Sequence, residues 1–339
     1  MRLSVVLPLF NEQENIEPLY ARLTATLDRI GCDFEIIFVD DGSRDDSLRI
    51  IERQADSDPR VKFLSLSRNF GHEVASTAGL DVADGDAVIL MDADLQDPPE
   101  LIEAMLDPWL RGYDVVYATR RRRRGDAVLK RAAIYLFYRL MRRVACVDLP
   151  VDTGDFRLMD RRVVEALRQF GEGQRFVRGL VSWMGFRQTA VEYDRAARHA
   201  GQGKYGVLRL CKFGMDALLG YSLVPLRIAA ALGLASSLAA LGTLGVAITR
   251  IMLGAAGPDA TQITLMALAL LGGVQLLAIG IAGEYVGRTH TEVLRRPLYL
   301  VDRQRGFDSA RTIRAIDIQR RPRPIEHIER HPPLREEAA

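Results

Sequence analysis

The stretch ILMDADLQDPPE, residues 89–100, places three carboxylates within six positions directly after a short apolar run. The carboxylates belong to Asp92, Asp94 and Asp97. Carboxylates packed this closely repel one another and raise one another's pKa unless a positive group lies between them. The pattern therefore predicts a buried strand that ends at a site for a divalent cation.

The N-terminal half alternates short apolar or β-branched runs with helical periods, which is typical of an α/β fold with a mainly parallel sheet. The predicted strands comprise residues 3–7, 34–39, 61–66, 87–91 and 114–117. Helix starts are expected near Asn11, Ser43 and Pro98, where capping or acidic residues precede a helical period.

Polar and acidic segments follow the first four predicted strands, at residues 8–12, 40–43, 67–72 and 92–97. Ligands of open parallel sheets bind at the carboxyl ends of the strands, so these segments are expected to line one site. Asp40 and Asp41 also allow a second interpretation, as helix-cap and turn residues, because Asp-Gly-Ser is favourable turn chemistry.

The metal expected at this site is Mg²⁺ or Mn²⁺. Such ions prefer one or two protein carboxylates supplemented by substrate phosphates. Asp92 and Asp94 offer two carboxylates at a strand end, and Gln96 can add an amide oxygen. A metal there would stabilise the charge of a departing diphosphate. An Asp-X-Asp pair alone is weakly specific, and its place after a buried strand strengthens the prediction.

The C-terminal half contains two long apolar stretches, about 226–253 and 263–283, joined by a short polar turn. Each supplies the roughly 20 residues that span a bilayer. A buried helical hairpin of a soluble domain is the alternative. Arg227 precedes the first stretch, and Arg288, Arg295 and Arg296 follow the core of the second. The positive-inside rule then places both termini in the cytoplasm.

Two further stretches, 129–144 and 207–219, mix basic residues with aromatic and aliphatic ones. That mixture favours amphipathic helices on an anionic membrane surface, and core-facing helices are the alternative. The expected layout is a cytoplasmic catalytic domain at 1–205, an interfacial segment at 206–225, two membrane helices within 226–283, and a partly disordered cytoplasmic tail at 284–339.

Composition limits the remaining classes. The chain has 339 residues and a formal net charge of +2, which is too small to suggest a nucleic-acid partner. Its three cysteines lack metal-ligand spacing and are expected to be reduced thiols. No signal peptide is expected, because a strand-like run begins within a few residues of Met1.

The ordered motifs resemble one family over nearly the whole chain, to about residue 301. They are VVLPLFNEQENI, VDDGSRDDS, LSRNFGHEVASTAGL, MDADLQDPPE, TGDFRLMDRR and GEYVGRTHTEVLRRPLY. The chain resembles the bacterial polyprenyl-phosphate glycosyltransferases, relatives of dolichyl-phosphate mannose synthase in glycosyltransferase family 2. The resemblance implies a GT-A domain that moves a sugar, with inversion, from a UDP- or GDP-sugar to polyprenyl (undecaprenyl) phosphate. Its site would face the cytoplasm at the inner membrane.

The resemblance also assigns residues. The nucleotide-binding positions are Pro8, Asn11, Glu12, Asp40, Asp41 and Asp92. The metal positions are Asp92, Asp94 and Gln96, with Asp94 and Asp155 as catalytic positions. The acceptor-phosphate positions are Arg131, Arg195, Arg198 and Lys204. Gly203 stands where the family's basic motif has serine, so a hydroxyl contact is lost or replaced by a backbone amide. Asp155 could instead be an ion-pair partner of Arg157 or Arg161.

A phosphate monoester with a second pKa of about 6 is largely a dianion at neutral pH, so its attack needs no strong general base. Asp155 is therefore expected to orient groups or stabilise positive charge. A processive polysaccharide synthase would need a Gln-X-X-Arg-Trp motif and more spans. A dinucleotide dehydrogenase would need Gly-X-Gly-X-X-Gly after the first strand. A non-catalytic nucleotide-sugar-binding partner and a homo-oligomer both stay open.

Overall fold

The computed structural model describes residues 1–120, 153–193 except 174, 224–253, 260–307 and 316–317. Within this part, nine strands form one sheet in the order β7-β5-β6-β4-β1-β2-β3-β8-β9. The central strands β1 (Arg2–Leu9), β2 (Asp33–Asp40), β3 (Val61–Leu66) and β4 (Ala87–Leu90) are parallel to their neighbours within this group. This is the parallel core that the alternating pattern predicts.

Antiparallel pairs extend the sheet on both sides of that core. β6 (Thr153–Asp160) lies antiparallel between β4 and β5 (Val115–Arg120), and β7 (Gln188–Tyr193) is parallel to β5. On the other side, β8 (Leu300–Arg305) is antiparallel to β3 and carries the short strand β9 (Ile316–Asp317). The sheet is therefore mixed, with a parallel centre and antiparallel flanks.

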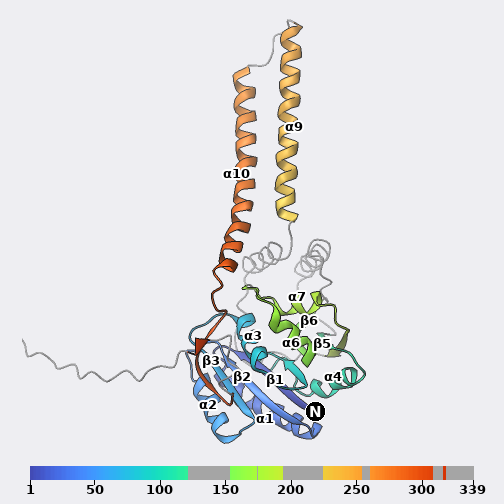
Figure 1. Ribbon diagram of the computed structural model, residues 1–339, viewed down its shortest axis with the longest axis vertical. Helices are drawn as coiled ribbons and strands as arrows, with labels where there is room; N and C mark the ends of the chain where they lie inside the picture. Colours follow the sequence, from blue (N-terminus) through green and yellow to red (C-terminus); the bar gives the residue numbers. More distant parts are fainter. Residues whose placement is uncertain (121–152, 174, 194–223, 254–259, 308–315, 318–339) are drawn as a thin grey trace, which may run out of the picture.

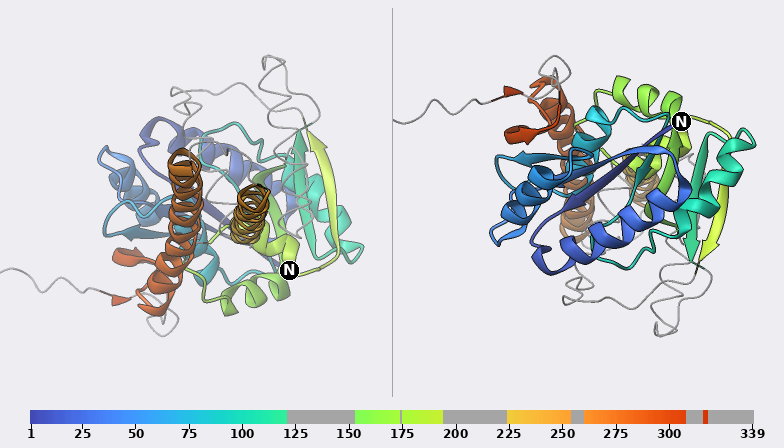
Figure 2. Two further views of the ribbon diagram at one scale, coloured as in Figure 1. Left: turned by 90° about the horizontal axis from the view of Figure 1, so that it is seen from above. Right: turned by 90° about the horizontal axis from the view of Figure 1, so that it is seen from below.

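Helices cover both faces of the sheet (Figure 2). One layer of buried residues joins the strands to α1 (Gln13–Ile30), α2 (Ser47–Ser57) and α4 (Leu101–Leu110). The other joins them to α3 (His72–Val82), α6 (Arg161–Gln169) and α7 (Val177–Trp183). Successive side chains of a strand point to opposite faces of the sheet, so Val5 of β1 packs in the first layer and Val6 in the second. Strands buried on both faces read as continuous apolar runs.

The five predicted strands are confirmed, with ends that differ by a few residues. The helix expected near Ser43 begins four residues later, at Ser47. The Ser43 hydroxyl instead accepts a hydrogen bond from the backbone N–H of Asn11, at 2.9 Å. This contact ties the loop after β1 to the loop after β2.

Two long apolar helices, α9 (Val224–Met252) and α10 (Ala260–Val293), leave the sheet domain on the same side (Figure 1). Their stretches Leu226–Arg250 and Leu270–Val293 are long and apolar enough to cross a bilayer. Only 7% and 0% of the most apolar windows are buried, so these helices are not part of the buried core of the described residues. The second helix continues ten residues beyond the predicted end at 283, to Val293.

The first part of the predicted cytoplasmic tail, from residue 284, forms regular structure. It begins as the last turns of α10, and residues 300–305 return to the sheet as β8. Buried Tyr299 and Val301 hold this return, and the Tyr299 hydroxyl donates to Asp81 at 3.1 Å. The proposed interfacial stretches 129–144 and 207–219 lie outside the described residues.

Candidate functional site

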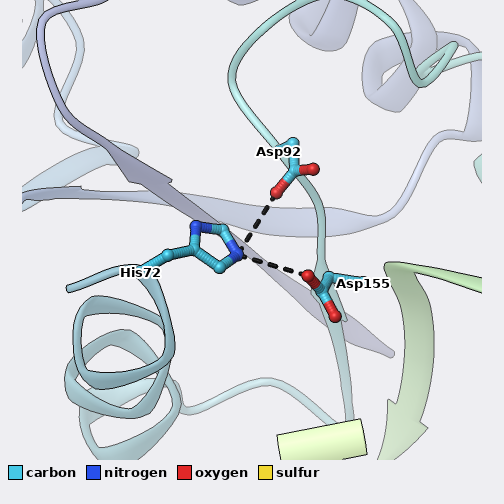
Figure 3. A group of neighbouring side chains, drawn as sticks. All are labelled: His72, Asp92 and Asp155. Carbon is cyan, nitrogen blue, oxygen red and sulfur yellow. Dashed lines mark ion pairs between the residues drawn. The ribbon is translucent and has the colours of Figure 1, made fainter. Parts of the chain in front are cut away.

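One edge of the sheet, where β3 and β4 end and the antiparallel β6 begins, brings together His72, Asp92 and Asp155 (Figure 3). His72 is the first residue of α3, Asp92 follows β4, and Asp155 lies in β6. The β4–β6 ladder pairs Leu90 with Arg157 in antiparallel register. Asp92 follows that last pair by two residues, and Asp155 precedes Arg157 by two, so both leave the ladder at the same edge. The sheet therefore places the two carboxylates side by side.

His72 lies between the two carboxylates. Its Nε2 is 3.4 Å from Asp92 Oδ1 and 3.4 Å from Asp155 Oδ2. Burial lowers the pKa of His72, but the hydrogen bond to Asp155 and the charges of both carboxylates outweigh it and raise the pKa to about 9. In this arrangement the ring is an imidazolium at neutral pH. It supplies the positive charge that the cluster needs.

Asp92 is the least stabilised carboxylate of the group. Burial and the charges of Asp155, Asp97 and Asp94 raise its pKa to about 7, and His72 opposes them only in part. Its Oδ1 atom is buried and accepts no hydrogen bond. Its contact with His72 Nε2 is an ion pair at 3.4 Å, so a metal ion bound to this atom would lie beside the ring or displace it. The raised pKa agrees with the repulsion that the sequence 92–97 predicts.

Asp155 is held in its ionised form. Burial alone would raise its pKa, but His72, Arg178 and Arg157 together hold the pKa well below its usual range. Arg178 donates from Nη2 to Asp155 Oδ1 at 2.8 Å, and Arg157 Nη2 lies 4.0 Å from the same atom. Arg161, the other partner considered from sequence, pairs with Asp84 at 2.7 Å. Asp155 is thus both an ion-pair partner and a member of the cluster.

Asp94 and Gln96, two of the three predicted metal ligands, lie in a tight turn beside the cluster. Asp94 Oδ1 accepts a hydrogen bond from the Gln96 backbone N–H at 3.1 Å, and Leu95 between them has a φ of 60°. Asp94 is buried, and among the described residues it is not a member of the three-residue group. Asp97 accepts a hydrogen bond from the Tyr193 hydroxyl of β7.

Asp40 supports its own turn, as its second interpretation predicts, whereas Asp41 binds a loop far away in the chain. Asp40 accepts hydrogen bonds from the Ser43 N–H at 3.0 Å and the Ser65 hydroxyl at 2.9 Å. Asp41 accepts from the backbone N–H groups of Phe70 and Gly71 at 2.7 and 2.9 Å. Burial raises the pKa of Asp41 despite these bonds. The loop after β2 thereby fixes the loop that leads into His72.

The glycine between these loops cannot carry a side chain. Gly42 has a φ of +71°, and a Cβ atom there would lie 2.6 Å from the backbone carbon of Arg68. Asp41 can reach the amides at 70 and 71 only because the two loops approach this closely.

The remaining nucleotide positions predicted by resemblance surround the same edge. Pro8 is buried in β1 and pairs with Val39. Asn11, with a φ of 56°, accepts from the Arg44 N–H at 2.8 Å, and the Glu12 N–H donates to the Ser47 hydroxyl at 3.0 Å. These bonds join the first two strand ends into one rim. Whether that rim holds a nucleoside stays a prediction.

The four acceptor-phosphate positions, Arg131, Arg195, Arg198 and Lys204, lie outside the described residues. Among the described residues, the roles of His72 and Arg178 were not predicted. His72 does fall in segment 67–72, which the strand-end rule selects, but only the fold shows its partners. Arg178 lies 23 positions from Asp155, and no spacing rule connects the two.

Comparison with known proteins places the chain in a family. Residues 4–168 match the family described as Glycosyl transferase family 2. An uncharacterized glycosyltransferase, sll0501, from Synechocystis sp. is 45% identical over 91% of this chain and 97% of its own. The prophage bactoprenol glucosyl transferase homolog of Escherichia coli is 39% identical over 89% of this chain and 99% of its own.

Among solved structures, mannosyl-3-phosphoglycerate synthase from Rubrobacter xylanophilus is similar, with 21% identity and a TM-score of 0.44. The similarity covers 65% of this chain and 72% of that one. The family assignment rests on the two relatives, which match over nearly their whole length, and not on the solved synthase structure. The chain therefore belongs to glycosyltransferase family 2, and its mostly parallel α/β domain has a GT-A-like fold.

Proposed function

We propose that this protein transfers a sugar from a UDP- or GDP-sugar to polyprenyl phosphate at the cytoplasmic face of the inner membrane. One observation carries the proposal. A relative from Shigella flexneri named bactoprenol glucosyl transferase is 39% identical over 89% of this chain and 97% of its own length. Coverage this complete takes in the catalytic domain together with the two apolar helices. The product would be a lipid-phosphate-linked sugar for a cell-envelope glycan.

The cluster suits a divalent cation. Its ligand atoms, one imidazole nitrogen and two carboxylate oxygens, lie within 4.8 Å of one another. Oxygen ligands suit both Mg²⁺ and Mn²⁺, and an added imidazole favours Mn²⁺. Asp92 would hold the ion with Asp155 and His72, or with Asp94 and Gln96 as the resemblance implies. A bound ion would supply charge stabilisation for the leaving diphosphate.

Ion binding would require His72 to lose its proton if the ring becomes a ligand, because a metal binds only neutral imidazole. If the ring stays an imidazolium, it would stabilise the negative charge of the diphosphate directly. In both cases a positive group lies between Asp92 and Asp155. The site can therefore bind an anionic donor despite its two carboxylates.

Asp155 would orient groups in this reaction. A carboxylate whose pKa lies well below its usual range is a weak base. The dianionic phosphate of the acceptor does not need one. The basic positions Arg131, Arg195, Arg198 and Lys204 would offset the charge of that phosphate, because two anionic reactants must meet in one site.

The proposed membrane placement follows from where the two substrates are found. The helices α9 and α10 would form a hairpin that returns the chain to its starting side, so both termini would be cytoplasmic. Nucleotide sugars are made in the cytosol, and the lipid phosphate would reach the site along the inner leaflet. An inner-membrane, two-span arrangement thus places both substrates at one site.

The test is a turnover assay with the full-length protein in lipid nanodiscs. A panel of UDP- and GDP-sugars is supplied with undecaprenyl phosphate and Mg²⁺ or Mn²⁺, and products are identified by mass spectrometry. We expect one lipid-phosphate monosaccharide that forms only with metal. A growing polysaccharide would indicate a synthase instead. Binding of a nucleotide sugar without any product would indicate a non-catalytic binding partner.

A further inference from the structure

A side chain in the last turn of α10 contacts the catalytic domain. Both carboxylate oxygens of Glu292 accept the backbone N–H of Gly173, at 2.8 and 3.0 Å. Glu292 is the second-last residue of α10, and its candidate membrane span ends one residue later. The contact thus lies where the apolar helix meets the sheet domain (Figure 1).

The segment that Glu292 holds leads directly into the active site. Gly173 precedes α7, whose first residue, Val177, donates its N–H to Glu73 at 3.0 Å. Glu73 is the neighbour of His72, and burial raises its pKa. The next residue of α7, Arg178, donates to Asp155 at 2.8 Å. Two successive residues of one short helix therefore bind a member of the cluster, Asp155, and the chain neighbour of another, Glu73.

The chain after α10 makes a second connection to the same cluster. The backbone carbonyl of Leu300, the first residue of β8, accepts the Ser67 N–H at 2.9 Å. Ser67 begins the loop that ends at His72, and Asp41 binds the amides of Phe70 and Gly71 within it. Ion pairs of Arg303 and Arg305 with acidic residues of α2 hold β8 in place. The cytoplasmic end of α10 is thus bonded on both sides to segments that position the cluster.

We infer that Glu292 is a positioning residue for sugar transfer. It holds the Gly173 amide ahead of α7 so that Arg178 stays on Asp155, and it thereby sets the active-site geometry according to the position of α10. The inference rests on the proposed function for its catalytic readout. Its structural readout, amide hydrogen exchange, does not depend on that function.

Two adjacent features make the contact specific. Gly173 has no side chain, and a Cβ there would lie 3.1 Å from Glu292 Oε1, so the carboxylate occupies the space beside the amide. The nearby Glu284, in contrast, pairs at 3.0 Å with Arg288 of its own helix. Glu284 is therefore a matched control, with the same residue type two turns earlier in α10.

The first experiment measures hydrogen exchange of the full-length protein in nanodiscs. Glu292→Ala should speed amide exchange in peptides that cover 173–178, and Glu284→Ala should leave it unchanged. The second measures steady-state transfer. Glu292→Ala should lower kcat about fivefold and leave KM for the nucleotide sugar within about twofold, because it removes a charge-assisted hydrogen bond that orders the site. Glu292→Gln, which keeps one acceptor oxygen, should restore part of kcat.

If amide exchange is unchanged in Glu292→Ala, or if Glu284→Ala has an equal effect, then the Glu292–Gly173 contact does not link α10 to the catalytic domain. Faster exchange with an unchanged kcat would overturn the positioning role, since the contact would then be structural only. A wild-type protein that forms no lipid-linked sugar would refute the proposed function, and the exchange comparison would still decide whether Glu292 orders the segment.

Discussion

Replacing Asp155 by asparagine tests the charge network around the cluster. The change keeps the size of the side chain and removes its charge. Arg178, at 2.8 Å from Asp155, and Arg157, at 4.0 Å, then lose their common anion. Because the Arg157 side chain is only 3% exposed, water cannot replace the lost partner. We expect the variant to be both less stable and less active.

The cost can be worked from the burial of the three side chains. Breaking a fully buried ion pair costs about 3–5 kcal/mol. Asp155 and Arg178 are each 20% exposed, and asparagine keeps one acceptor oxygen, so about 2 kcal/mol is the better value for this site. For a domain of this size about 1 kcal/mol shifts Tm by roughly 2–4 °C. The expected decrease in Tm is therefore roughly 4–8 °C.

The assay is thermal unfolding of the purified protein in detergent, with turnover measured in parallel. Glu17→Gln is the control, because its pair with Arg53 is 58% and 64% exposed and should contribute at most about 1 kcal/mol. Asp155→Asn should also lower transfer by about two orders of magnitude, the usual effect of losing one preorganised charge.

A double-mutant cycle gives the sharpest comparison. Asp155→Asn and Arg178→Gln share one interaction, so together they should destabilise by about 1 kcal/mol less than the sum of the single changes. Additive effects would show that the two side chains act separately. A Tm within about 1 °C of wild type in Asp155→Asn would refute the network outright.

Three further outcomes are expected. Asp94→Asn should abolish transfer while the protein stays folded and membrane-inserted, measured by turnover and Tm; normal turnover with unchanged metal dependence would remove Asp94 from the site. Burial raises the pKa of Glu35, but hydrogen bonds from Lys62 and Ser4 outweigh it and lower the pKa, so the stability it contributes is present above the unfolded pKa of about 4.3 and is lost as pH falls through the folded value. Glu35→Gln should therefore lower Tm at pH 7 and have less effect near pH 3. A cysteine introduced by Asp259→Cys should react with an impermeant reagent from the periplasmic side, and labelling only after permeabilisation would refute the two-span topology.

The parallel core could be predicted because its strands are apolar on both faces. The strands that the sequence did not predict are polar. β6 carries Asp155 and Arg157, whose charges compensate each other only in the folded sheet. β8 carries Arg303 and Arg305, which pair with acidic residues of α2 across the edge of the sheet. A hydropathy pattern cannot identify strands whose charged residues find partners far away in the chain.

The residues of the site also differ in whether the sequence could predict them. Asp92 could be predicted because a carboxylate directly after a buried strand is a local signal. His72 and Arg178 reach the cluster only through the placement of α3 and α7, and no spacing in the sequence encodes that placement. The resemblance assigned Asp92, Asp94 and Gln96 to the metal, and the structure shows His72 and Asp155 beside Asp92. Which of these side chains hold an ion stays a prediction. Local patterns therefore indicated the strand end, and the fold adds neighbours of Asp92 that the sequence did not indicate.

The register of β4 and β6 predicts a contrast between the two carboxylates that it brings together. Like charges directly opposite each other destabilise a sheet. Asp155 is compensated by two arginines, whereas Asp92 has a pKa raised to about 7, so its ionised form destabilises the folded protein as pH rises above about 4. Asp92→Asn should then raise Tm at pH 8 in metal-free buffer, while Asp155→Asn lowers it, and both should lose transfer. Added Mn²⁺ should raise the Tm of the wild type and not that of Asp92→Asn, because the ion would add positive charge beside Asp92, which His72 compensates only in part. A decrease in Tm for Asp92→Asn under metal-free conditions would show that its carboxylate is already compensated and that the cluster is not built for a cation.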